Sequence, residues 1–138
     1  MRYALLACLL LPLGHAAFAA DAKPAVKVET LLATGTSWDG VAYKAYPTGD
    51  PELSVLKISI PAHSALAWHE HPIPNAAYIL SGTLTIEKHD GSKKTVHAGQ
   101  AVAEMVDAAH RGVTGDTPVV LLAFYAGAKG IGLSKPAH

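Results

Sequence analysis

The stretch Trp68-His69-Glu70-His71-Pro72 is the most informative part of this sequence. In an extended strand the side chains of residues i and i+2 project from the same face, so His69 and His71 are expected to point toward one place. A third histidine, His110, follows in a later segment of the chain. Three imidazoles from two strands can form a binding face for one divalent metal ion. The sequence therefore predicts a metal site made by His69, His71 and His110.

The sequence around these histidines alternates between short strand-like segments and turns. Apolar and polar side chains alternate partly in residues 53–60 and cleanly in residues 83–88, as in strands with one buried face. His89-Asp90-Gly91-Ser92 lies between two such segments and predicts a hairpin. Residues 119–125 are almost wholly apolar, which is typical of a strand covered on both faces. No longer window has helical periodicity, so the sequence predicts an all-β sandwich or barrel.

Residues 1–19 have the composition of a secretory signal peptide. Arg2 supplies the positive charge, residues 3–13 form the apolar run, and Ala17-Phe18-Ala19 fits the cleavage pattern. The run is shorter than the roughly 20 residues that a membrane-spanning helix needs. An uncleaved anchor and a lipid attached at Cys8 are the alternatives. We expect a periplasmic or secreted protein whose mature domain spans residues 20–138.

Charge and cysteine content limit the classes of partner. Of 11 Lys and Arg residues one is Arg2, which leaves 11 − 1 = 10 against 11 Asp and Glu residues. No basic stripe or polybasic patch is present, so we expect neither a nucleic-acid partner nor membrane binding after signal cleavage. The single cysteine, Cys8, lies in the expected signal peptide, so the mature domain is expected to have no disulfide bond. A bound metal could supply additional stability to that domain. A small molecule is the favoured partner, and residues 119–125 could form either the core or a homodimer interface.

The spacing of the histidines resembles that of the cupin superfamily. The segment His69-x-His71-x3-Asn75-x6-Gly82 resembles the first cupin motif, G-x5-H-x-H-x3,4-E-x6-G. The segment Gly99-x5-Met105-x-Asp107-x2-His110-x3-Thr114 has the spacing of the second motif, G-x5-P-x-G-x2-H-x3-N. Both lie within residues 63–114. The resemblance implies a small single-domain cupin: a double-stranded β-helix, or jelly-roll, barrel with one divalent metal inside, held by the three histidines.

The sequence departs from the cupin motifs at five positions. Asn75 stands where the first motif has its glutamate ligand, and His63 stands where that motif begins with glycine. Met105, Asp107 and Thr114 replace the proline, glycine and asparagine of the second motif. The fourth ligand of the family is therefore in question. Asn75 could coordinate weakly through its amide oxygen or leave the position to water.

Glu104 offers a second source for the missing carboxylate. It lies in the otherwise apolar run 101–106, and a lone carboxylate is costly to bury unless it is paired or bound to a metal. One interpretation makes Glu104 a metal ligand. The other lets it point to solvent from one face of a strand. The turn expected at residues 106–109 prevents the alternation from being followed to His110, so the sequence leaves both open.

Together these residues predict a metal-dependent cupin that acts on a small oxygen-rich molecule, as a dioxygenase, an isomerase or a lyase. Asn75 would orient substrate or water, and Glu104 would be a ligand or a general base. The cofactor is expected to be a divalent transition metal: Mn, Fe, Zn, Ni or Cu. The alternative function is a non-catalytic, metal-stabilised barrel that captures a small ligand, because fold alone does not decide function. A third interpretation treats the histidines as ordinary barrel residues without a metal.

Overall fold

The computed structural model describes residues 25–137, so the expected signal peptide at residues 1–19 lies outside the described part of the chain. These residues form nine strands and no helix, and hence no helix that could cross a membrane. The strands are β1 (Pro51–Ile60), β2 (His69–Glu70), β3 (Asn75–Ser81), β4 (Thr83–Lys88), β5 (Lys93–His97), β6 (Ala101–Ala103), β7 (His110–Thr114), β8 (Val119–Ala128) and β9 (Lys135–Pro136).

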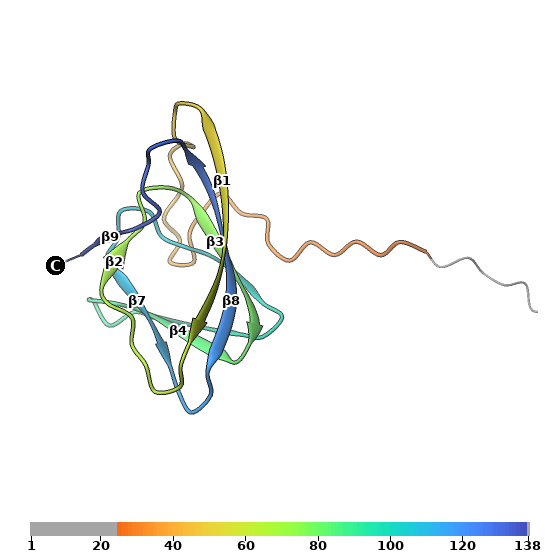
Figure 1. Ribbon diagram of the computed structural model, residues 1–138, viewed down its shortest axis with the longest axis vertical. Helices are drawn as coiled ribbons and strands as arrows, with labels where there is room; N and C mark the ends of the chain where they lie inside the picture. The colour runs from red at the N-terminus through yellow and green to blue at the C-terminus, as the bar shows by residue number, and fades with distance from the viewer. Residues whose placement is uncertain (1–24, 138) are drawn as a thin grey trace, which may run out of the picture.

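The strands form two antiparallel sheets that face each other across the core (Figure 1). One sheet has the strand order β1-β8-β3-β6 and the other has the order β5-β4-β7-β2-β9. Strands that are distant in the sequence, such as β3 and β8, are direct neighbours. The prediction of an all-β double-stranded β-helix is confirmed.

Alternation of side chains determines which face of each strand enters the core. Leu84 and Ile86 on β4 are both buried, as the pattern of residues 83–88 predicts. On β3, Asn75, Ala77 and Ile79 point inward in the same way. The expected hairpin joins β4 to β5. Each of these strands therefore buries one apolar face against the core, as strands of antiparallel sheets commonly do.

The interpretation of residues 119–125 as a strand covered on both faces is wrong. In β8, Leu121, Ala123 and Tyr125 face the core and are buried. Phe124, on the opposite face, is 43% exposed. Both faces of this strand carry apolar residues, but within the described chain only the inner face is fully covered.

Two residues at glycine positions of the cupin-like motifs keep a glycine-like backbone. His63 has a φ of 51° and Asp107 has a φ of 52°, and both lie where the motifs have glycine. Left-handed backbone of this kind is strained for a residue with a side chain. Thr114, at the asparagine position, accepts a hydrogen bond from the Ser64 amide (2.9 Å) and donates one to the Pro61 carbonyl (2.6 Å). These loops therefore keep their shape although their residues have changed.

Substituting Gly82 by alanine is expected to destabilise the barrel far more than the same change at Gly91. Both glycines have positive φ, 81° and 85°, so alanine costs about 1–2 kcal/mol of backbone strain at either. A Cβ at Gly82 would also overlap the Pro118 carbonyl oxygen, whereas Gly91 has open space around it. We expect a loss of more than about 3 kcal/mol for Gly82→Ala in urea unfolding, beyond strain alone. Equal losses for the two variants would contradict the close approach.

Candidate metal centre

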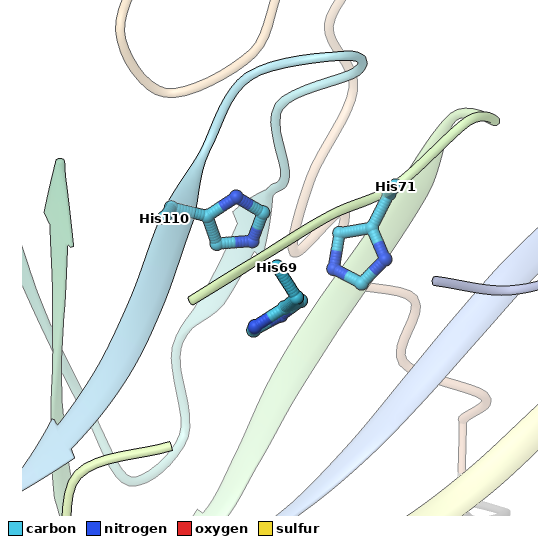
Figure 2. Close-up of side chains that lie close together, drawn as sticks. All are labelled: His69, His71 and His110. Atoms are coloured by element: carbon cyan, nitrogen blue, oxygen red, sulfur yellow. The ribbon is translucent and has the colours of Figure 1, made fainter. Parts of the chain in front are cut away.

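The structure brings His69, His71 and His110 together between the two sheets (Figure 2). His69 lies opposite His110 in the pairing of β2 with β7, and His71 follows directly after β2. The ring centroids are 4.5 Å apart for His69 and His110, and 5.0 Å apart for each of the other two pairs. One candidate ligand atom from each residue lies within 4.8 Å of the others. The three imidazole rings therefore converge, as the spacing of the histidines in the sequence predicts.

Backbone carbonyl groups fix which nitrogen of each imidazole is free. Each Nδ1 lies 2.8 Å from a carbonyl oxygen, which can only accept a hydrogen bond, so each Nδ1 carries the proton. The carbonyl groups belong to Ala67 for His69, Leu133 for His71 and Ala108 for His110. The lone pair of every ring is therefore on Nε2, the atom that remains for a metal. Such hydrogen bonds orient the histidine ligands of known metal sites.

Glu104 is buried, at 7% exposure, so it does not point to solvent. Its Oε2 lies 3.4 Å from His110 Nε2, and neither atom has a hydrogen-bond partner in the described chain. Because Nδ1 of His110 already carries the ring proton, Nε2 turns a lone pair toward the carboxyl group. Two donor atoms about 2.1 Å from one ion are about 3.4 Å apart at the tetrahedral angle. The pair thus fits donors that share a cation.

Burial controls the protonation of these groups. It lowers the pKa of His71 to about 4 and also lowers the pKa of His110, so both rings are neutral at neutral pH. Burial raises the pKa of Glu104 to about 7. Without a cation the site therefore disfavours a charged His110–Glu104 pair. Neutral imidazole is the form that a metal binds, and a bound cation would favour the ionised carboxylate.

A row of polar side chains crosses the opposite sheet. Asn75 pairs in register with Tyr125 on β8, and the Glu104 amide donates to the Asn75 carbonyl (3.0 Å) on the other side. The carboxylate thus lies one strand away from position 75, where the cupin-like motif would have its glutamate. The Asn75 side-chain NH₂ group donates to the Ile73 carbonyl (3.3 Å), which leaves its amide oxygen available to a ligand.

A cavity of about 70 Å³ lies between the histidines and this row. Its polar lining consists of the three histidines, Asn75, Glu104 and Tyr125, and the rest of its wall is mostly apolar. A cavity of about 150 Å³ admits benzene, so this one has room only for a smaller molecule. Tyr125 was not predicted as a site residue, because residues 119–125 were expected to be covered on both faces. Its inward alternation with Leu121 and Ala123 was the available signal.

The C-terminal segment positions the strand that carries two of the histidines. β2 has only two residues, and it is paired on one side with β7 and on the other with β9. The Lys135 ammonium lies 3.3 Å from the Glu70 carboxylate and 3.5 Å from that of Asp107. Leu133, from the same segment, supplies the carbonyl that holds His71. No motif in the sequence indicated this contact.

The chain was compared with known families and structures. Residues 57–125 match the family described as Cupin domain. A comparison with curated proteins found no match. Among solved structures, the chain is similar to the DMSP lyase DddQ from Ruegeria pomeroyi DSS-3, at 20% identity and a TM-score of 0.55, covering 62% of this chain and 43% of that chain.

Two further structures have similar folds. One is an oxalate decarboxylase from Lactobacillus farciminis in a formate complex, at 18% identity and a TM-score of 0.52, covering 61% of this chain and 26% of that one. The other is a cupin-like protein from Thermotoga maritima, at 13% identity and a TM-score of 0.53, covering 65% and 77%. This chain spans less than half the length of the lyase and of the decarboxylase. These likenesses show a shared fold.

Replacing Glu104 by glutamine is expected to change how the metal-free protein responds to pH. The pKa of Glu104 is near 4.5 when unfolded and about 7 when folded, so the folded chain binds the proton more tightly and loses stability as the pH rises through this range. The total loss is about 3 kcal/mol, at about 1.4 kcal/mol for each pH unit. Glu104→Gln has no carboxyl group here and so lacks this loss of stability. The pH dependence that His71 contributes is common to the wild type and the variant. Urea unfolding after chelator treatment should therefore favour Glu104→Gln increasingly from pH 4.5 to pH 7.

The same pair of proteins with excess divalent metal provides the control. A cation bound to the carboxylate stabilises the wild type by mass action, so Glu104→Gln should then become the less stable protein at pH 7. Parallel pH profiles of the two proteins, with and without metal, would contradict the placement of Glu104 beside the imidazole lone pair.

Proposed function

The chain belongs to the cupin family, and we propose that it is a metal-dependent cupin that acts on a small oxygen-rich molecule. The observation that supports this most strongly is the buried, unpartnered pair of Glu104 Oε2 and His110 Nε2. Buried polar atoms without partners are rare in folded proteins and call for an explanation such as an ion. The Nε2 atoms of His69 and His71 lie near that of His110, and nitrogen and oxygen donors match the preferences of a divalent transition metal. Glu104 contacts His110 but lies outside the group of side chains whose ligand atoms are all within 4.8 Å of one another, so its carboxylate has to turn toward the other two rings to complete the set.

The proposed ligand set is His69, His71, His110 and Glu104. Three neutral imidazoles and one carboxylate provide the same chemical donors as the cupin motif, with the carboxylate supplied from the segment after β6. Asn75 is uncharged and is not a ligand in this set, so we assign it the role of orienting substrate or water. Mn, Fe, Zn, Ni and Cu all accept nitrogen and oxygen donors, so the donor set supports the class of metal without selecting one.

The cavity limits the size of the substrate. A cavity of about 70 Å³ favours a two- or three-carbon acid or dicarbonyl compound. It does not suit a fused aromatic ring system unless the barrel opens. The similar folds of a DMSP lyase and an oxalate decarboxylase support bond cleavage in a small acid as the first chemistry to test, ahead of isomerisation and dioxygenation.

The chain's own residues would then bind and orient this molecule. A metal ion in the site would supply Lewis acidity toward a substrate oxygen. The free amide oxygen of Asn75 can accept a hydrogen bond from a substrate hydroxyl group. The buried phenol of Tyr125, whose pKa burial raises to about 12, stays protonated and can donate to a substrate oxygen. The apolar walls, among them Ile58, Leu66 and Leu121, limit the water that enters.

One observation supports the non-catalytic alternative: the proposed site has four protein ligands. Four donors saturate an ion that takes four ligands, and such closed sites are structural. An ion that takes five or six ligands keeps positions open to substrate. The metal found in the native protein therefore separates the two functions. For its location, we propose export to the periplasm or beyond, because residues 1–19 read as a cleaved signal.

Metal content measured on single variants tests the ligand set. We expect about one metal ion per chain in the wild type, none in His110→Ala, and at least about a tenfold weaker affinity in Glu104→Gln. Asn75→Ala, at the family's ligand position, should keep its metal, and His89→Ala on the exposed surface is the control. A chain that loses metal on changing Asn75 but not Glu104 would contradict the proposed set.

Turnover of small oxyacids by the metal-loaded wild type tests the activity. We expect two- and three-carbon acids to react and fused aromatic diols such as naphthalenediols to remain unchanged, because the cavity of about 70 Å³ is too small for a fused ring system. Asn75→Ala should lower this turnover while the metal content stays constant. A metal-replete protein that binds these acids without converting them would support the non-catalytic alternative instead.

A further inference from the structure

The side chains that enter the barrel change from polar to small and apolar along two neighbouring strands. Asn75 of β3 pairs in register with Tyr125 of β8, and two residues further along Ala77 pairs with Ala123. All four residues line the cavity of about 70 Å³. Residues i and i+2 of a strand share a face and lie about 6.8 Å apart. One wall of the cavity therefore has a polar row and, beside it, a row that carries only methyl groups.

The opposite wall of the cavity changes in the same way. His110 and Gly112 of β7 are both buried and line the cavity, and Gly112 pairs in register with Ile86 of β4. A Cβ at Gly112 would lie 3.1 Å from Leu84 Cδ1 and 3.4 Å from Leu66 Cδ1, so both leucines approach the bare backbone closely. Beside the histidine, this wall therefore consists of a glycine and large apolar side chains.

The polar residues of the two walls meet at the same end of the cavity. The ring centroids of His71 and Tyr125 are 5.5 Å apart, and Glu104 contacts His110. The next buried polar side chain along β7 is Thr114, which does not line the cavity and donates its hydroxyl hydrogen to a backbone carbonyl (2.6 Å). Within residues 25–137, the apolar end therefore offers a ligand no side-chain hydrogen-bonding group.

The charge of the cavity wall is as one-sided as its polarity. In the described part of the chain, no lysine or arginine lines the cavity. A ligand carboxylate at the apolar end would therefore be buried without a partner, which is costly. A ligand methyl group in the same place would leave water for an apolar surface, which is favourable. The cavity thus distinguishes a molecule with one polar end from a molecule with two.

We propose that the cavity takes a short monocarboxylic acid with a hydroxyl or oxo group beside its carboxylate and a methyl group at its other end. The carboxylate and the neighbouring oxygen face the three histidines, Asn75 and Tyr125. The methyl group lies against Ala77 and Ala123, which thereby determine specificity. This inference rests on the proposed function, and it narrows the substrate class to acids without a second charged group.

Calorimetric titration with two matched acids tests the selectivity. Tartronate is lactate with a carboxylate in place of the methyl group, so both acids present the same hydroxy acid group to the histidines. We expect metal-loaded wild type to bind lactate at least about tenfold more tightly, because the second carboxylate of tartronate would be buried without a partner. Equal affinity for the two acids, or no binding of either, would overturn this inference alone. A wild type that binds no metal would overturn the proposed function as well.

Variants of the two alanines test their role in the same titration. Ala77→Val fills the methyl site and should weaken lactate binding at least about tenfold, whereas Ala76→Val, on the outer side of the same strand, should leave it unchanged. Ala123→Ser adds a hydroxyl group at the methyl site, so this variant should prefer glycerate, which is lactate with a hydroxymethyl end.

Metal content and the urea midpoint of each variant separate a change in selectivity from loss of metal or misfolding. If Ala77→Val is too unstable to titrate, the Ala123→Ser variant, which adds one oxygen atom, still decides the role of this row. An Ala123→Ser protein that keeps the wild-type preference for lactate over glycerate would refute it.

Discussion

A carboxyl group buried against an imidazole lone pair is the constraint on which the site depends. Glu104 Oε2 and His110 Nε2 face each other at 3.4 Å, each buried and each without a hydrogen-bond partner among residues 25–137. A buried polar group without a partner costs about 1–3 kcal/mol. The two sheets maintain this unfavourable contact through pairing elsewhere: β2 is held between β7 and β9, and the Glu104 amide is bonded to β3. The barrel therefore carries a cost that a shared cation would remove.

In the proposed site the carboxylate comes from a neighbouring place in the fold rather than from the motif's own position in the sequence. Asn75 lies on β3 and Glu104 follows directly after the neighbouring strand β6, and both side chains line the same cavity as the imidazoles. His63 and Asp107 illustrate the same relation for the backbone, since both keep the left-handed conformation of the glycines that the motifs contain. A motif read residue by residue would score positions 63, 75 and 107 as losses, although positions 63 and 107 keep the left-handed backbone.

Much of the fold could be predicted because it depends on local periodicity and spacing. Alternation at residues 83–88, the Gly91 hairpin and the i, i+2 histidines each act over short distances. The direction of Glu104 could not be predicted, because the left-handed turn at Asp107 breaks the alternation between it and His110. Tyr125 was hidden because both faces of its strand are apolar, and the support of β2 by β9 depends on a contact without a sequence signal. The signal peptide remains a prediction.

The imidazoles are oriented by backbone carbonyl groups, those of Ala67, Ala108 and Leu133. Every amino acid carries a carbonyl group, so no single replacement at these three positions can delete the acceptor. Only a change in the course of the main chain can do so. Substitutions at these three positions during evolution therefore leave the orientation of the imidazole rings unchanged. Among related barrels, the residues that aim the rings are expected to be among the most freely variable, although the histidines themselves are not.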